Sequence, residues 1–491
     1  MFKDFIRNHL FMFSIIGAVV AASLLCLWLA TGQQLWFDES YSVVIAKKSL
    51  GDIISLTAVD AHPPFFYTLL HFWGALVGWN ELGLRALSVI FYAASIGLIL
   101  LLISKLFSKK TAIYSAPVLA LAPFIMRYGF EVRMYSLASL IVVGSAFALY
   151  YAMKTNKNRY WIIYGLLVAL GVWTLYMTFI VFLAQLIILV MHTLKKRGKW
   201  FKQKWVLAYF GAVLLYLPWI PNALHQMSGG ALSGANVTFG FSQLLNVFSF
   251  GLIYEPSNQC DVIYWILLAS ILLATAVLIR NVLRKKNTDA KNLWFLMLHF
   301  ALPLAIFMII ASPIFGWKIY LERYLAQFII FGYASLAVVF ASNIFANKKP
   351  IYSAYFAVLI VLLIGVANLS QTGNFNYQRM DKPANHDIAN IVSKYCKQSI
   401  VVDDLYFYIE LAPYMSSDCN YYFSSPGEVD FVGGYAPLHA SNRRIAKPSE
   451  INTKQLVVVD VKPKANFKPS AAYKKISEKE MTWRRFTVYS R

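Results

Sequence analysis

Long uncharged apolar runs recur along this chain of 491 residues and restrict its possible folds more than any other feature. Several runs reach the roughly 20 residues that a helix needs to cross a bilayer. Charged residues make up 14% of the chain, whereas a typical soluble protein carries about 25%. Because a helix satisfies all its backbone polar groups within one segment, it is the natural structure for such runs in lipid. The pattern therefore predicts a polytopic α-helical membrane protein.

We expect about eleven membrane-spanning helices, with the N-terminus on the cytoplasmic side. They are expected at residues 10–31, 84–104, 112–126, 134–152, 160–177, 178–194, 204–222, 262–280, 293–314, 324–346 and 351–369. Lys3 and Arg7 precede the first run, as in a signal peptide, but no small-residue cleavage site follows it. We therefore expect the first helix to be retained.

The net charge of +22 is spread over short basic clusters between the apolar runs. Examples are Lys109–Lys110, Lys154–Arg159, Lys195–Lys204 and Arg280–Lys291. Such clusters mark cytoplasmic loops under the positive-inside rule. They favour topology signals beside anionic lipid headgroups over a nucleic-acid site. With an odd number of spans, the chain after residue 370 lies outside the plasma (inner) membrane.

Two domains are expected: a transmembrane domain over 1–370 and a small extracytoplasmic α/β domain over 371–491. In the second domain, the patterns predict strands at Ser399–Asp404, Gln455–Val461 and Trp483–Tyr489, and helices at Asp387–Cys396 and Leu405–Met415. Cys396 and Cys419 both lie in this domain, where oxidation is permitted. The sequence leaves two alternatives for this pair: a disulfide or two free thiols.

Two long outer loops are expected, at residues 32–83 and 223–261. In the first loop, apolar and polar residues are mixed at the spacing of an amphipathic helix, which predicts helices along the membrane surface. These helices are expected at Ser40–Lys48, Asp52–Val59 and Pro64–Val77. The second loop contains the apolar stretch Phe239–Tyr254, for which we expect a mobile lid or another interfacial helix.

Ionisable residues are almost absent from the expected spans and gather at the outer surface instead. Transporters usually need ionisable groups near the bilayer midplane. The pattern therefore favours an interfacial enzyme whose substrate has an apolar tail and a polar reacting head. If that head is a phosphate ester, cations must hold the departing phosphate and a carboxylate must accept a proton. The candidate carboxylates are Asp38 and Glu39, and the candidate cations are Arg127, Arg133, Lys318 and Arg323.

Each candidate also has a purely structural interpretation. Asp38 and Glu39 could cap the helix expected to begin at Ser40, because acidic residues favour helix N-termini. His62 could lie in a plain turn formed with the prolines that follow it. The arginines could be interfacial anchors whose charged ends reach the headgroups.

Four motifs combine into a more specific pattern. They are Trp36-Phe37-Asp38-Glu39-Ser40-Tyr41-Ser42, Asp60-Ala61-His62-Pro63-Pro64-Phe65-Phe66-Tyr67, Glu131-Val132-Arg133-Met134-Tyr135-Ser136 and Glu322-Arg323-Tyr324-Leu325. Together they resemble the C-type (GT-C) membrane glycosyltransferases, in the branch related to protein O-mannosyltransferases and aminoarabinose transferases. The resemblance covers about residues 1–370, and the first two motifs are its most specific part.

The resemblance implies a GT-C fold and an inverting glycosyltransferase. Such an enzyme moves a monosaccharide from a polyprenyl-phosphate carrier to an acceptor hydroxyl on the outer face. The acceptor would be a cell-envelope glycan, a lipid or a protein; membrane lipids are the other expected partners, and no nucleic acid is expected. Asp38 is implied as the base, with Glu39 beside it. The expected substrate-binding residues are Tyr41, Asp60, His62, Arg127, Glu131, Arg133, Tyr135, Lys318, Arg323 and Tyr324.

Metal dependence stays open, because a divalent metal (Mg or Mn) assists some relatives and not others. Asp38 and Glu131 would be its ligands, but the second acidic motif of the superfamily is not clearly matched at Glu131.

Three other functions remain as alternatives. A lipid-linked glycan polymerase or ligase would use longer, diphosphate-linked donors. A lipid-linked sugar flippase would need a polar path through the spans, which the sequence does not show. A non-catalytic sensor would not need the clustered acids and arginines.

Overall fold

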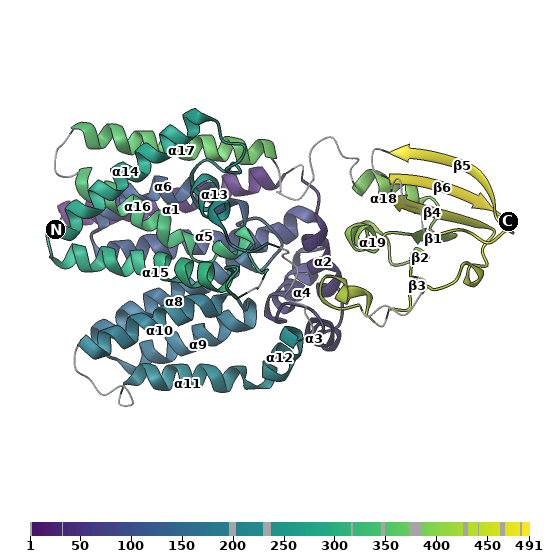
Figure 1. The fold of residues 1–491 in the computed structure, drawn as a ribbon, viewed down its shortest axis with the longest axis horizontal. Coiled ribbons are helices and arrows are strands. Elements are labelled where there is room, and N and C mark those ends of the chain that lie inside the picture. Colours follow the sequence, from purple (N-terminus) through teal and green to yellow (C-terminus); the bar gives the residue numbers. More distant parts are fainter. Residues whose placement is uncertain are drawn as a thin grey trace. The chain divides into compact units, whose positions relative to one another are not determined.

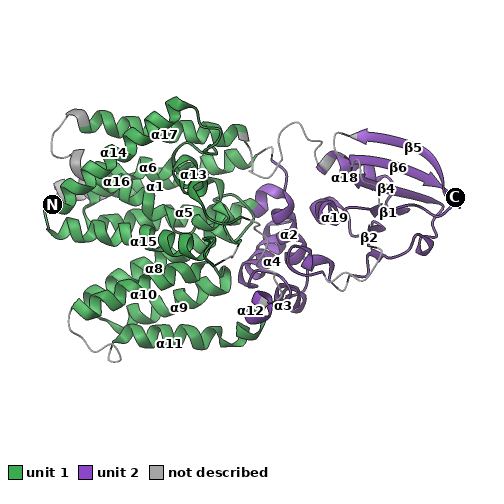
Figure 2. Cartoon of the chain, in the orientation of Figure 1, with its two compact units in different colours: residues 1–31, 85–223, 232–372 green, residues 32–84, 224–231, 373–491 purple. Residues whose placement is uncertain are grey.

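The computed structural model describes residues 2–31, 33–195, 203–228, 237–315, 318–344, 349–372, 385–425, 431–439, 441–461, 467–481 and 484–491. These residues form two compact units, coloured separately in Figure 2. Unit 1 contains residues 1–31, 85–223 and 232–372, and unit 2 contains residues 32–84, 224–231 and 373–491. The first expected outer loop therefore shares a unit with the C-terminal segment.

Unit 1 is built from apolar helices (Figure 1). They are α1 (Phe2–Ala30), α5 (Glu81–Leu106), α6 (Lys109–Ala120), α7 (Pro123–Arg127), α8 (Tyr135–Thr155), α9 (Asn158–Thr174), α10 (Thr178–Lys195), α11 (Lys204–Tyr216), α13 (Phe241–Leu252), α14 (Val262–Arg284), α15 (Thr288–Ile310), α16 (Ile329–Ile344) and α17 (Lys349–Thr372). A helix lies in each segment expected to span the membrane. Among the described residues, eight helical segments are long and apolar enough to cross a bilayer.

Four of the expected spans contain a helix that is shorter than predicted. Helices α6, α9, α11 and α16 have 12, 17, 13 and 16 residues. The helical path of α11 continues through a 3-10 turn into α12 (Ile220–Ser228), so that Lys204–Met227 is together long enough to cross a bilayer. The expected span 112–126 divides because α6 ends at Ala120 and α7 begins at Pro123, which lacks the N–H that a continuous helix requires. The span expected from 324 begins as helix α16 only at Ile329, after the short 3-10 turn η3 (Glu322–Leu325). The full count of spans stays a prediction.

Small residues allow some helices of unit 1 to pack very closely. Helices α9 and α11 lie against each other, and a Cβ atom placed on Gly165 would come within 2.7 Å of the Ala208 carbonyl oxygen. Close backbone approach through glycine and alanine is typical of helix packing in membranes.

The first part of unit 2 consists of the short helices α2 (Phe37–Ala46), α3 (Leu50–Ala58) and α4 (Phe65–Val77). All three were expected, but α2 begins three residues earlier than predicted. The reason is local, because the Glu39 carboxylate accepts a hydrogen bond from the Trp36 N–H and so satisfies a donor at the helix start. Helix α12 (Ile220–Ser228) joins this region through Gln226, which donates to the Thr57 carbonyl at 2.7 Å.

The C-terminal part of unit 2 contains a six-stranded mixed sheet in the order β3-β2-β1-β4-β6-β5 (Figure 1). The strands are β1 (Ser399–Val402), β2 (Tyr421–Ser424), β3 (Arg444–Ile445), β4 (Gln455–Val461), β5 (Lys474–Met481) and β6 (Arg484–Ser490). Strands β1 to β4 pair in parallel, and β6 runs antiparallel to β4 and β5. Helices α18 (Asn385–Ser393) and α19 (Leu405–Leu411) accompany the sheet.

The predicted strands β1, β4 and β6 and both predicted helices are present, although Trp483 lies outside the described residues. Strands β2, β3 and β5 were not predicted. Strand β5 is an edge strand rich in lysine and glutamate, so it shows no apolar alternation.

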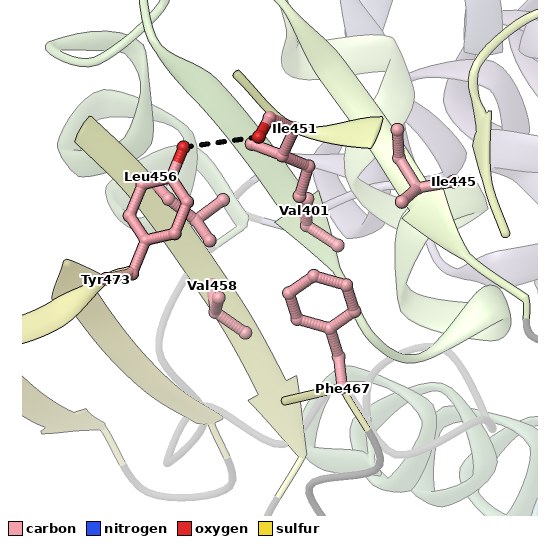
Figure 3. Packing of buried hydrophobic residues seen from close by; sticks show 7 residues of the cluster. All are labelled: Val401, Ile445, Ile451, Leu456, Val458, Phe467 and Tyr473. Carbon is pink, nitrogen blue, oxygen red and sulfur yellow. Dashed lines mark hydrogen bonds between the residues drawn. The ribbon is translucent and has the colours of Figure 1, made fainter. Parts of the chain in front are cut away.

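One apolar cluster fills the space beside the sheet (Figure 3). It contains Val401, Ile445, Ile451, Leu456, Val458, Phe467 and Tyr473. The Tyr473 hydroxyl donates to the Thr453 carbonyl at 2.7 Å and also lies 3.5 Å from the Ile451 carbonyl (Figure 3), which satisfies its polar atom at the edge of the cluster. Cys396 and Cys419 form a disulfide, so the first of the two alternatives for this pair is confirmed.

Candidate active site

Helix α2 carries Asp38 and Glu39 in its first turn. The Glu39 side chain is 1% exposed, and its carboxylate accepts the Trp36 N–H at 3.4 Å. Asp38 is only half-buried. The helix-capping interpretation therefore applies to Glu39, with the helix beginning at Phe37 rather than Ser40. Asp38 is the more accessible carboxylate of the pair.

Three further candidates of unit 2 lie near one another. The Asp60 carboxylate is buried, 3.4 Å from His62 Nδ1, and accepts a hydrogen bond from the Tyr67 hydroxyl at 3.5 Å. The Tyr67 ring lies 6.2 Å from the Tyr41 ring on α2. Tyr41 is buried, and its hydroxyl donates to the Gly433 carbonyl at 3.3 Å. The structure thus connects the first and second motifs through an aromatic contact.

In unit 1, Arg127 and Glu131 form a buried ion pair after helix α7. Their side chains are each 1% exposed, and Arg127 Nη1 lies 2.9 Å from Glu131 Oε2. The Arg127 guanidinium also lies over the rings of Tyr128 and Phe130, at 5.3 and 5.6 Å from their centroids. Arg133 is buried as well. Burial within the protein does not fit the interpretation of these two arginines as headgroup anchors.

Tyr254 and Glu322 lie around this ion pair and extend it into a larger cluster. Burial raises the pKa of Glu322. A hydrogen bond from Asn246 and the charge of Arg323 act in the opposite direction and lower this pKa. Tyr254 hydrogen-bonds Arg127, and its pKa is raised chiefly by burial and also by the nearby charges of Glu131 and Glu322. Buried opposite charges and phenol groups therefore meet at one place in unit 1.

The remaining candidates of unit 1 differ in exposure. Tyr135 is buried and packs edge-on against Tyr128 at 5.4 Å. Arg323 and Tyr324 are half-buried in the η3 turn, and Lys318 is exposed. Of the candidate cations, Arg323 and Lys318 are thus the more accessible ones.

Several residues of this region escaped prediction. Arg85 is 1% exposed and donates to the Ala30 carbonyl at 2.8 Å, although it lies in a span expected to be nearly free of charge. Its position close to the start of that span was the available signal. Tyr254 and Glu322 were also missed as neighbours of Arg127, because nothing in their local sequence reports the distant contact. Tyr128, which directly follows Arg127, was not singled out either.

Metal dependence stays a prediction. Among the described side chains, no group of three His, Cys, Asp or Glu residues is arranged to hold a metal ion. Glu131, one of the two expected ligands, pairs with Arg127, so its carboxylate faces a cation of the protein itself.

An apolar pocket of about 370 Å³ lies within unit 1, among helices α13 to α16. Its lining includes Leu252, Ile271, Phe300, Ile329 and Tyr333. A pocket of this character suits a hydrocarbon chain.

Comparisons with known proteins agree with these features. Residues 61–225 match the family model of dolichyl-phosphate-mannose-protein mannosyltransferases. The fold is similar to crystal structures of ArnT from Cupriavidus metallidurans in the apo state (TM-score 0.65, 11% identity) and bound to undecaprenyl phosphate (TM-score 0.64, 12% identity), each covering 96% of this chain and 97% of that chain. It is also similar to the Archaeoglobus fulgidus oligosaccharyltransferase in complex with Zn and sulfate (TM-score 0.51, 13% identity), covering 90% of this chain and 67% of that chain. No curated protein sequence matches the chain.

These matches confirm the predicted resemblance to the GT-C membrane glycosyltransferases. The chain has the GT-C fold that ArnT shows over nearly its whole length.

Proposed function

We propose that this chain is an inverting glycosyltransferase. It transfers a monosaccharide from a polyprenyl-phosphate carrier to an acceptor hydroxyl at the outer face of the plasma membrane. The observation that carries this proposal is the contrast within the first turn of α2, where Glu39 is buried against the helix start and Asp38 is half-buried. The fold shared with ArnT, which was solved with undecaprenyl phosphate, supports a polyprenyl carrier.

In the proposed reaction, Asp38 accepts the proton of the acceptor hydroxyl. The hydroxyl oxygen attacks the anomeric carbon of the sugar, and the bond from that carbon to the lipid phosphate breaks. The phosphate oxygen keeps the bonding electrons. Because the hydroxyl attacks from the face opposite the lipid phosphate, the configuration at the anomeric carbon inverts. A well-placed general base contributes about 10²- to 10⁴-fold to such a step.

Arg323 and Arg133 are the proposed phosphate ligands, because the forked guanidinium group binds phosphate oxygens in pairs. Lys318 would add charge from an exposed position. Arg127 is assigned a different role, since it pairs with Glu131 and hydrogen-bonds Tyr254. The apolar pocket of unit 1 is the proposed place for the first isoprene units of the carrier.

The test is transfer activity of the purified protein in lipid nanodiscs, with radiolabelled polyprenyl-phosphate sugars and a panel of acceptors. We expect Asp38→Asn to lower kcat by about 10²- to 10⁴-fold while donor binding and the melting temperature stay unchanged. Glu39→Gln is the matched control. Because Glu39 contacts the backbone at the helix start, this variant should lower the melting temperature while kcat changes little. A folded Asp38→Asn protein with wild-type turnover would exclude Asp38 as the base.

A lipid-linked glycan polymerase or ligase is the second candidate, favoured by the fold likeness to the oligosaccharyltransferase. Diphosphate-linked oligosaccharide donors in the same assay distinguish the two. Transfer from these donors alone would replace the first proposal with the second.

A further inference from the structure

We propose that the C-terminal α/β part of unit 2 is a working part of the active site, because it fixes helix α2 in place. The α2 contact surface, as we name it, consists of residues 405–414 and 433–438, in α19, η4 (Ala412–Tyr414) and η5 (Gly433–Leu438). Tyr406 and Gly433 are its positioning residues. This inference rests on the proposed role of Asp38 as the base.

The first contact is an aromatic stack next to Asp38. The ring of Phe37 stacks on the ring of Tyr406, with centroids 3.8 Å apart and planes inclined by 10°. Phe37 is 8% exposed, whereas Tyr406 is 41% exposed. Tyr406 therefore covers Phe37 on its outer side and fixes the residue that precedes Asp38 in the chain.

The second contact lies one helical turn further along the same face of α2. Tyr41 follows Phe37 by four residues, and its hydroxyl donates to the Gly433 carbonyl at 3.3 Å. The Gly433 N–H in turn donates to the Val59 carbonyl at 2.8 Å, at the end of α3. Gly433 adopts a φ of 58°, in the left-handed region that glycine tolerates best. One glycine thus links the contact surface to α2 and to the end of α3, two helices of the first loop.

Polar contacts hold both ends of α2. Before the helix, the Leu35 N–H donates to the Tyr414 hydroxyl at 2.9 Å. Within it, the Ser40 hydroxyl donates to the Glu410 carbonyl at 3.1 Å. After it, Lys47 Nζ donates to the Pro413 carbonyl at 3.4 Å.

These contacts matter because α2 is too short to orient itself. It has ten residues, and isolated helices of that length are marginal in water. A general base must lie within hydrogen-bond reach of the proton that it accepts. Loosening the contact surface should therefore move Asp38 away from its working position while the donor-binding residues proposed in unit 1 stay intact.

The decisive variant is Tyr406→Ala, with Tyr406→Phe as the conservative counterpart that keeps the ring. A matched control is Tyr395→Ala, since Tyr395 packs on Phe486 of β6, which is also 8% exposed, at 5.8 Å. This control removes an aromatic pair of the same sheet domain that lies outside the residues of the α2 contact surface. Two readouts are needed: kcat and the donor KM in nanodiscs, and hydrogen exchange of the α2 amides by mass spectrometry.

We expect Tyr406→Ala to raise exchange in α2 and to lower kcat by about 10- to 100-fold, as small misplacements of reacting groups do, with an unchanged donor KM. Tyr406→Phe and Tyr395→Ala should behave like the wild type in both readouts. Unchanged exchange in Tyr406→Ala would show that Tyr406 does not hold α2, and faster exchange with normal kcat would show that the hold does not serve catalysis. If the wild type itself transfers no sugar, the proposed function fails, whereas the exchange result still decides whether Tyr406 holds α2.

Discussion

Two acidic side chains, one from each unit, have opposite surroundings. In unit 1, Glu131 is fully buried and lies 2.9 Å from the guanidinium of Arg127. In unit 2, Asp38 is half-buried, next to Glu39, which is buried against the backbone. A carboxylate that neutralises a buried cation maintains structure, whereas one that reaches solvent can exchange a proton with a substrate. The surroundings of an acid therefore distinguish a structural role from a proposed chemical one better than its position in a motif.

The largest expected effect comes from breaking the buried pair of unit 1. Glu131→Ala leaves the Arg127 charge buried without its carboxylate, which should cost about 3–5 kcal/mol of unfolding free energy. Asp38→Ala, at a half-buried position, should cost no more than about 0.5 kcal/mol. Thermal unfolding in detergent measures both.

The double variant Arg127→Met, Glu131→Leu is the control for this prediction, because it removes both charges and should recover most of the lost stability. Equal melting temperatures for Glu131→Ala and Asp38→Ala would abolish the distinction between the two acids.

The disulfide gives unit 2 a stabilising link with no counterpart among the described residues of unit 1. It joins Cys396 to Cys419, 23 residues apart. Closing a loop of that size contributes about 3 kcal/mol. The double variant Cys396→Ala, Cys419→Ala should therefore unfold the sheet at lower denaturant concentration, as seen by hydrogen exchange in β1 and β2. Cys260→Ala, which removes a free thiol, is the control, and equal stability of the two variants would contradict the assignment.

The helical architecture could be predicted from sequence because apolar length is a local property. A helix lies in every segment that was expected to span the membrane. The errors arose where one residue changes the backbone chemistry, as at Pro123, or where the sequence is polar, as in β5. An edge strand with five Lys and Glu among its eight residues carries little hydrophobic signal.

The site was predictable as a set of residue types but not as a set of contacts. The motif around Asp38 identified the candidate base, and the buried Arg127 and Arg133 were singled out as cations. Contacts such as the hydrogen bond from Ser40 to the Glu410 carbonyl join residues 370 positions apart. No local pattern reports a contact at that separation. The contacts that fix α2 in place could therefore be found only in the structure.

A smaller effect concerns how helices approach one another in unit 1. Gly165→Leu would place its Cβ 2.7 Å from the Ala208 carbonyl oxygen, which is backbone and cannot rotate away. Overpacking of this kind costs about 1–3 kcal/mol. Gly211→Leu on the facing helix α11 is the matched control, because a Cβ there meets nothing within 4 Å. If both variants melted together, close approach of α9 and α11 would not limit the stability of unit 1.

The smallest expected effect is a pH dependence that belongs to unit 1. Burial raises the pKa of Glu322 above its ordinary value of 4.5, so the folded protein binds this proton more tightly than the unfolded chain does. The stabilisation is complete below the unfolded pKa and is lost as pH rises through the folded pKa. Melting temperatures of the wild type should therefore fall, relative to those of Glu322→Gln, as pH increases from 4.5 toward neutrality. The glutamine variant cannot ionise at this position. If the melting temperatures of the two proteins changed in parallel with pH, Glu322 would titrate normally. The cluster around Arg127 would then be open to water, which the burial of Glu131 contradicts.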